Sequence, residues 1–258
     1  MPVRSLHLPD LDAHLCYHDL AGRDPVWVYL HGMGTASSSD FPAIVRHPGL
    51  TPYRALLVDL LGSGFSDRPD AFSYTLEAHA ATVARLLDHL VLRGCRLVGH
   101  SFGGSVAIVL AATRPDLVDG LVVAEPNLEP EDATLSRTVA DQTEEAYVRA
   151  GHAELIAQAE EWAAETPAWA DFPGTLRATD PAAMRRGATS LVAASLSVTF
   201  FGLSLPRTYV FGALSLPHHH EEQLRGGEVR VAVVPGAGHG MMGENPDGVA
   251  QVLADTLP

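Results

Sequence analysis

The chain has 258 residues, of which 47% are hydrophobic and 19% charged, and this composition of a folded globular protein excludes extensive disorder. Its 17 Lys and Arg residues against 31 Asp and Glu residues give a formal net charge of −14. A surface of that sign repels nucleic-acid phosphates and anionic lipid, so we expect neither nucleic acid nor a membrane as a partner.

The cysteines, the first residues and the apolar stretches indicate the cellular compartment in which we expect the protein. Cys16 and Cys95 are too few for a disulfide framework or a thiolate metal site. The first residues show no basic start followed by an apolar run, which predicts no signal peptide. The longest apolar stretch, Leu191–Leu205, has 15 residues with several Ser and Thr among them, and is short for a membrane span. We therefore expect a cytoplasmic protein; its oligomeric state stays open.

Strand-like and helix-like runs alternate through the first half of the chain. Ser5–Leu8 and His14–Tyr17 predict an antiparallel pair, and a helix is predicted from Leu76 to Val91 with Thr75 or Ser73 as its cap. Strands alternating with helices predict an α/β fold with a mostly parallel central sheet covered on both faces. The other elements expected in this half are strands at Val26–Leu30, Arg54–Leu60, Arg96–Val98 and Leu117–Ala124, and a helix at Ser105–Ala112.

The pattern changes after Glu125. Residues 127–205 show helical patterns, including Thr138–Thr166 and Pro181–Phe201, and no convincing strand. We therefore expect a helical insertion at 127–205 within a core domain formed by residues 1–126 and 206–258. The core elements expected after the insertion are strands at Thr208–Phe211 and Val229–Val234 and a helix from Pro246 toward Leu257.

The strongest chemical signal is the G-x-S-x-G pattern at Gly99–Gly103, which lies between a predicted strand and a predicted helix. A strand that turns sharply into a helix needs small residues on either side and leaves the residue at its apex projecting from the sheet. Ser101 is therefore predicted to be a nucleophile. The amide of Phe102 opens the helix and is predicted to stabilise an oxyanion.

Two further glycine-rich loops follow predicted strands. His31–Gly34 allows close approach of the backbone to a ligand, and its Met33 amide is the expected second oxyanion donor. A serine hydroxyl needs an adjacent base, and His239 is the histidine that lies in such a loop, Pro235–Gly240. The residues expected to contact a substrate are Gly32, His100, Met241 and Met242.

With these motifs the chain resembles proteins of the α/β-hydrolase fold superfamily over nearly all its length. The resemblance rests on His31–Gly34, Asp59–Ser66, Gly99–Gly103 and Gly236–His239. It implies an α/β-hydrolase fold with an inserted helical cap at the 127–205 insertion. It also implies that the loop Asp59–Ser66 is mainly structural, so we do not place Ser66 in the site.

The sequence departs from this family at the acid of the catalytic triad. The family usually carries it after the seventh strand in a G-x-x-D pattern, where this chain has Gly212–Ser215, and serine cannot stabilise an imidazolium by charge. Glu125, at the end of the preceding strand, is the preferred candidate, because some family members place their acid there. Glu221 and Glu222 are the alternatives, and a site without an acid would be a dyad of Ser101 and His239.

The run His218–His220 is unusual, but adjacent histidines rarely converge on one ion, so we expect a solvated loop and no metal or other cofactor. The hypothesis favoured by the motifs is a serine hydrolase that acts on a small or medium, mostly apolar ester or lactone, while amide, thioester and carbon–carbon bonds stay open. A serine nucleophile argues against haloalkane dehalogenase or epoxide hydrolase chemistry, for which the resemblance implies an aspartate. The alternatives are a non-hydrolytic enzyme of this fold, such as a lyase, perhydrolase or cofactor-free oxygenase, and a small-molecule binding protein with slow turnover.

Overall fold

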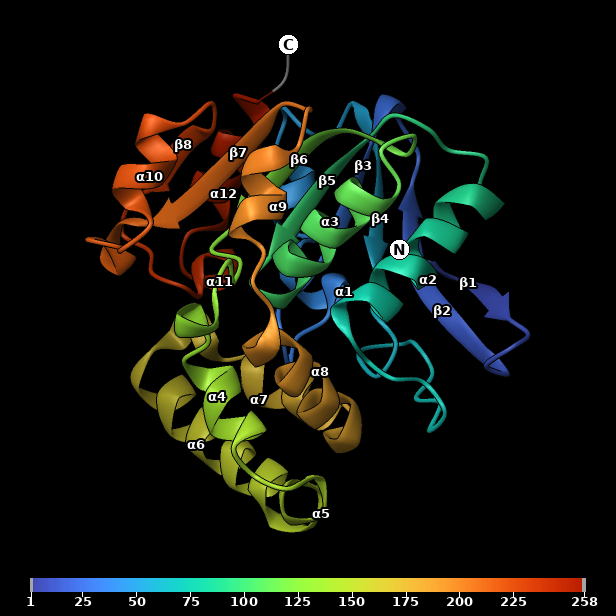
Figure 1. Cartoon of the computed structure of the whole chain (residues 1–258), viewed down its shortest axis with the longest axis vertical. Helices are drawn as coiled ribbons and strands as arrows, with labels where there is room; N and C mark the ends of the chain where they lie inside the picture. The colour runs from blue at the N-terminus through green and yellow to red at the C-terminus, as the bar shows by residue number, and fades with distance from the viewer. Residues whose placement is uncertain (1, 257–258) are drawn as a thin grey trace.

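A computed structural model describes residues 2–256 and contains an eight-stranded sheet in the order β1-β2-β4-β3-β5-β6-β7-β8 (Figure 1). The pairs β1–β2 and β2–β4 are antiparallel, and the other neighbours are parallel, as the sequence predicts. The strands are β1 Val3–Leu8, β2 Ala13–Leu20, β3 Arg23–Leu30, β4 Tyr53–Val58, β5 Cys95–His100, β6 Val118–Ala124, β7 Arg207–Gly212 and β8 Arg230–Val234.

Helices cover both faces of the sheet because successive strand residues point to opposite sides. In β3, Val28 and Leu30 face a core shared with α2 (Leu76–His89), α3 (Phe102–Thr113) and α10 (Glu221–Gly226). The intervening residues of the strand face a second core. That core is built with Phe41, which follows α1 (Ser37–Asp40), and with η1 (Ile44–Arg46), α11 (Met241–Glu244) and α12 (Pro246–Ala254).

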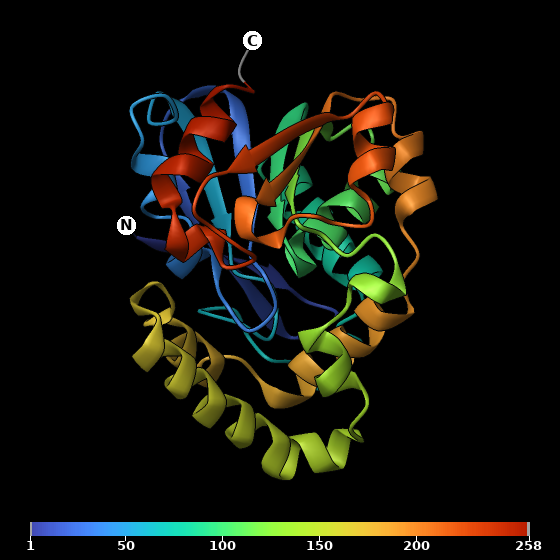
Figure 2. The same cartoon turned by 90° about the vertical axis from the view of Figure 1, so that its left-hand side faces the viewer.

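Between β6 and β7 the described chain contains helices and turns and no strand, as expected. We call residues 130–193 the helical segment; in Figures 1 and 2 it forms a separate layer beside one end of the sheet. It comprises η2 Pro130–Asp132, α4 Leu135–Ala140, α5 Glu144–Ala146, a π-helical turn Tyr147–Gly151, α6 His152–Glu165, η4 Pro167–Trp169, α7 Phe172–Arg177 and α8 Pro181–Ala193.

Each of the two helical regions expected here is divided into more than one helix. Thr138–Thr166 is not one helix, because the chain leaves α4 at Ala140 and re-enters a helix at Glu144 through the cap Thr143, whose hydroxyl accepts the Ala146 amide. The second expected pattern, Pro181–Phe201, likewise contains two helices, α8 and α9 (Ser197–Gly202). Phe200 of α9 is fully buried in the core shared with α3, so α9 packs on the sheet layer.

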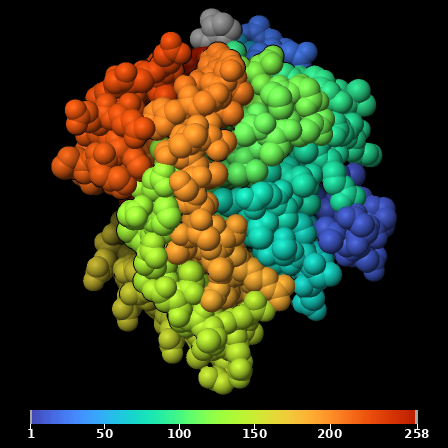
Figure 3. Space-filling view, viewed as in Figure 1, coloured from blue at the N-terminus to red at the C-terminus, as the bar shows by residue number. Residues whose placement is uncertain are grey.

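The two connections between the sheet and the helical segment run side by side (Figure 3). The Leu196 amide donates to the Leu128 carbonyl at 2.6 Å, and the Ser195 hydroxyl donates to the Glu129 carboxylate at 2.7 Å. These bonds join the stretch of chain that enters the helical segment from β6 to the stretch that leaves it toward β7. No helix within residues 2–256 is both long and apolar enough to cross a membrane.

Candidate functional site

Ser101 forms the turn between β5 and α3 by itself. Its backbone has φ 49° and ψ −119°, a left-handed conformation that costs a non-glycine residue energy. The flanking glycines are required by space: a Cβ on Gly99 would lie 2.5 Å from the Gly103 carbonyl oxygen, and one on Gly103 would lie 2.4 Å from the His31 carbonyl oxygen. This turn places the Ser101 side chain at the end of the central strand.

The neighbouring strand β6 ends in the same way. Glu125 follows it with φ 42°, and its side chain is 9% exposed. One carboxylate oxygen accepts the Gly212 amide at 2.8 Å, and the other lies 2.8 Å from His239 Nδ1. Burial raises the pKa of Glu125, but the hydrogen bond and charge of His239, with the Gly212 amide, outweigh it and lower the pKa below its ordinary value.

His239 lies in the loop between β8 and α11, and His100 holds its backbone. Burial lowers the pKa of His100 to about 3, with repulsion from His239 adding to the effect, so this ring is neutral at pH 7. Its Nε2 must carry the proton, because it lies 2.8 Å from the His239 carbonyl oxygen. The other ring nitrogen is buried and makes no hydrogen bond within the described chain.

Ser101 and His239 line the same cavity, but no hydrogen bond joins the hydroxyl to the ring among the residues that the structure describes. Because Nδ1 of His239 is bonded to Glu125, Nε2 is the nitrogen left to exchange a proton with a hydroxyl. Such contacts are often long before a substrate binds and tighten in the complex.

The two expected oxyanion donors flank this serine. Phe102 is the first residue of α3, so its amide has no carbonyl one turn earlier in the helix. Met33 follows Gly32, where a Cβ would lie 2.9 Å from His100 Nδ1. Within residues 2–256 neither the Met33 nor the Phe102 amide has a hydrogen-bond partner.

A cavity of about 620 Å³ lies between the strand ends and the helical segment. Of the expected contact residues, Gly32, His100 and Met242 line it. Met241 does not: it is fully buried and packs in the core beneath the sheet. Apolar side chains from the helical segment form the opposite wall, namely Leu135, Trp169, Phe172 and Leu191.

The sequence did not single out the contact that joins the helical segment to the His239 loop. Trp169 Nε1 donates to one Glu244 carboxylate oxygen at 2.9 Å, and the Gly238 amide donates to the other at 2.6 Å. We call this contact the Trp169–Glu244 bridge. Gly240 lies against the indole, since a Cβ there would come within 2.8 Å of it.

Where the family usually carries its acid, Ser215 lines the cavity, and its hydroxyl also helps to lower the pKa of Glu125. Among the described residues, Glu125 is the carboxylate that contacts His239. Of the two alternatives, Glu221 pairs with Arg225 at 3.0 Å on α10, and Glu222 is exposed on the same helix.

The sequence interpretation of His218–His220 as a solvated loop is wrong for His220, whose side chain is 8% exposed. All three rings lie near Asp132, a residue of the helical segment that the motifs did not single out. By contrast, Ser66 is structural as expected, since its buried hydroxyl donates to the Asp59 carbonyl and accepts the Cys16 amide.

A model of the family described as alpha/beta hydrolase fold matches residues 25–205. The 2-hydroxy-6-oxo-2,4-heptadienoate hydrolase of Pseudomonas putida is 35% identical over 107 residues, 41% of this chain and 38% of that protein. The haloalkane dehalogenase of Mesorhizobium japonicum is 35% identical over 125 residues, 48% of this chain and 39% of that protein. The chain thus spans about two fifths of the length of these relatives.

The fold also matches solved structures. An esterase from Thermogutta terrifontis superposes with a TM-score of 0.82 at 22% identity, over 99% of this chain and 97% of that one. At this identity the likeness shows the fold and leaves the chemistry to the residues of the site.

Asp40 also lines the cavity, and the ionisation of its carboxyl group affects the stability of the folded protein. Burial raises the pKa of Asp40 to about 7, against the opposing hydrogen bond from the Thr35 hydroxyl at 2.7 Å. The folded protein therefore keeps a proton that the unfolded chain releases near pH 4. Between about pH 4 and pH 7 the folded state binds more protons, so the free energy of unfolding falls as the pH rises.

We expect the Asp40→Asn substitution to remove this fall in the free energy of unfolding with rising pH. Measured by urea unfolding, the stability difference between Asp40→Asn and wild type should grow in favour of the variant from about pH 4 to pH 7 and stay constant above pH 7. Asp12→Asn, at a fully exposed carboxylate, is the control. A difference that does not change with pH would contradict the assignment.

Proposed function

The chain belongs to the α/β-hydrolase fold family, and we propose that it is a serine hydrolase that cleaves a small or medium, mostly apolar carboxylic ester or lactone. The observation that carries this proposal is the 2.8 Å contact of Glu125 with His239, which lines the same cavity of about 620 Å³ as Ser101. Nucleophile, base and acid are thus supplied by side chains of this chain.

In the proposed reaction, the Ser101 oxygen attacks the carbonyl carbon and gives its proton to His239 Nε2. Glu125 holds the opposite ring nitrogen, which fixes the ring orientation, and its negative charge stabilises the imidazolium that forms. The lowered pKa of Glu125 keeps that charge in place at neutral pH.

The carbonyl oxygen becomes negative as the new bond forms. The free amides of Met33 and Phe102 are the proposed donors to it, and the Phe102 amide acts with the positive end of the α3 dipole. His239 then protonates the leaving alcohol. Water, deprotonated by the same ring, attacks the acyl-enzyme and releases the acid and the free serine.

We propose that the 127–205 insertion acts as a cap over a core domain of residues 1–126 and 206–258. Its Leu135, Trp169, Phe172 and Leu191 supply the apolar wall, so the cavity favours an apolar acyl or alcohol group. The Trp169–Glu244 bridge fastens this wall to the loop of His239.

Ser101 can be tested as the nucleophile with a fluorophosphonate probe. Wild type should take up one probe per chain at Ser101, and Ser101→Ala should take up none and lose about 10³-fold or more of its kcat/KM on p-nitrophenyl butyrate. Ser66→Ala is a control because its hydroxyl is engaged in the Asp59 loop. Full turnover by Ser101→Ala would exclude the mechanism, and an inert wild type would favour ligand binding or non-hydrolytic chemistry.

The position of the acid can be tested by moving it. Glu125→Gln should lower kcat by about 10²- to 10⁴-fold, because the imidazolium loses its counter-charge. Adding Ser215→Asp to that variant should restore at least part of the loss, since Ser215 stands near Glu125 and the cavity. Glu221→Gln should match wild type in the same assay. A Glu125→Gln variant with full activity would refute the triad.

The Trp169–Glu244 bridge can be tested with Glu244→Gln, which keeps the shape and removes one of the two acceptor oxygens. We expect about a tenfold lower kcat/KM, because the His239 loop and the cap wall lose their common anchor. Glu160→Gln, at an exposed α6 carboxylate paired with Arg177, should have no effect on steady-state rates. Equal rates for Glu244→Gln and wild type would show that the bridge does not position the site.

A further inference from the structure

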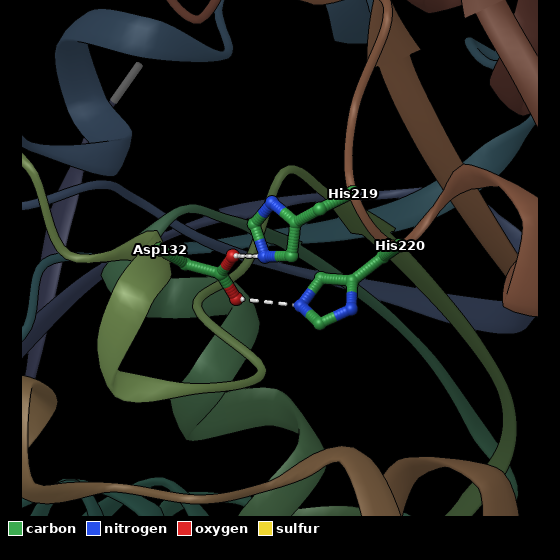
Figure 4. Close-up of side chains that lie close together, drawn as sticks. All are labelled: Asp132, His219 and His220. Carbon is green, nitrogen blue, oxygen red and sulfur yellow. Dashed lines mark hydrogen bonds and ion pairs between the residues drawn. The ribbon is translucent and has the colours of Figure 1, made fainter.

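Three consecutive histidines precede α10, and their rings surround one carboxylate of the helical segment. His220 Nε2 lies 3.0 Å from Asp132 Oδ2, and His219 Nε2 lies 2.8 Å from Asp132 Oδ1. His218 Nε2 is 4.0 Å from Oδ1. Figure 4 shows the His219 and His220 rings turning one nitrogen each toward the two oxygens of Asp132. A nitrogen and oxygen ligand set of this kind is not used by the proposed hydrolysis.

Asp132 is held in place by hydrogen bonds to one of its carboxylate oxygens, while the other oxygen has no hydrogen-bond partner within the described chain. Its side chain is 6% exposed, and Oδ2 accepts the Leu128 amide at 2.8 Å and the Glu129 amide at 2.9 Å in addition to His220. Oδ1 is buried and makes no hydrogen bond within the described chain, although His219 Nε2 lies close to it. A buried carboxylate oxygen with unused acceptor capacity is costly unless a positive group occupies the place it faces.

The three rings are packed together around this carboxylate. The His218 and His219 ring centroids are 4.4 Å apart, and those of His219 and His220 are 4.1 Å apart. One nitrogen each of His219 and His220 is thus gathered at the two oxygens of Asp132.

We propose that Asp132, His219 and His220 form a binding site for a divalent transition-metal ion of the Zn²⁺ type. Imidazole nitrogen and carboxylate oxygen are ligands that Zn²⁺ takes at about 2.0–2.2 Å, which in a tetrahedral site separates ligand atoms by about 3.3 Å. His219 Nε2 and His220 Nε2 approach different oxygens of Asp132, at 2.8 and 3.0 Å, and one ligand atom from each of the three residues lies within 4.8 Å of the other two. His218 or water completes the coordination.

The site would join parts of the chain that are far apart in sequence. Asp132 ends η2 at the start of the helical segment, and His220 lies 88 positions later, in the connection between β7 and α10. Asp132 and His218 also line the cavity. A bound ion therefore ties the helical segment to the sheet layer at the cavity edge, and we expect it to raise the midpoint of thermal unfolding by several degrees.

The test is a calorimetric titration of ZnCl₂ into the chelator-treated full-length protein, repeated with CoCl₂ and visible absorption. We expect one Zn²⁺ per chain, a Co²⁺ ligand-field spectrum of nitrogen and oxygen ligation, and at least tenfold weaker binding by His219→Ala and His220→Ala. His7→Ala, at an exposed histidine beside Asp12, is the matched control and should bind as wild type does.

His219 is 53% exposed, so its removal leaves the packing intact and the result can be interpreted without a folding defect. Asp132→Asn keeps an acceptor for the backbone amides and removes the charge, with circular dichroism to check its fold. Absence of Zn²⁺ binding by wild type, or equal affinity in wild type, His219→Ala and His220→Ala, overturns the proposal. These readouts do not use ester turnover, so they stand whether or not Ser101 is the nucleophile.

Discussion

The site depends on the backbone conformation of one residue, Ser101. A serine at φ 49° costs about 1–3 kcal/mol, and it persists because the surroundings allow no other path from β5 into α3. Its amide is bonded to the Ala124 carbonyl of β6 at 2.9 Å, and Gly103 lies too close to the backbone at His31 to carry a side chain. This turn fixes the hydroxyl at the strand end, and the adjacent Phe102 amide is left free at the start of α3.

A similar positive-φ residue at the end of β6 positions Glu125, the proposed acid. Glu125, with φ 42°, projects its carboxylate across the end of β7, where the Gly212 amide and His239 are its donors. A carboxylate on β6 can thus take over the contact that an acid after β7 would make, and the vacated position carries the neutral Ser215. His100 completes the arrangement by holding the backbone of His239 with a ring that stays uncharged.

The sequence predicted the features that are encoded locally. The alternation of strands and helices, the cap Thr75 of α2 and the glycines around Ser101 each follow from neighbouring residues, and the fold confirms them. Predictions failed where contacts between residues distant in sequence determine the structure. Met241 lies outside the cavity lining because it is buried in the core at the start of α11, and Phe200 is buried in the core of the sheet layer, so α9 is separate from the helical segment. The approach of Asp132 to His219 joins segments that no local pattern connects.

In the proposed reaction Ser101 carries the acyl group during turnover. The most direct measurement is peptide mass spectrometry on the enzyme quenched with acid during the burst with a slowly deacylated p-nitrophenyl ester. We expect one added acyl mass, confined to the peptide that contains Ser101. An enzyme that turns the ester over with no acyl-enzyme, or with the acyl group on another residue, would contradict it.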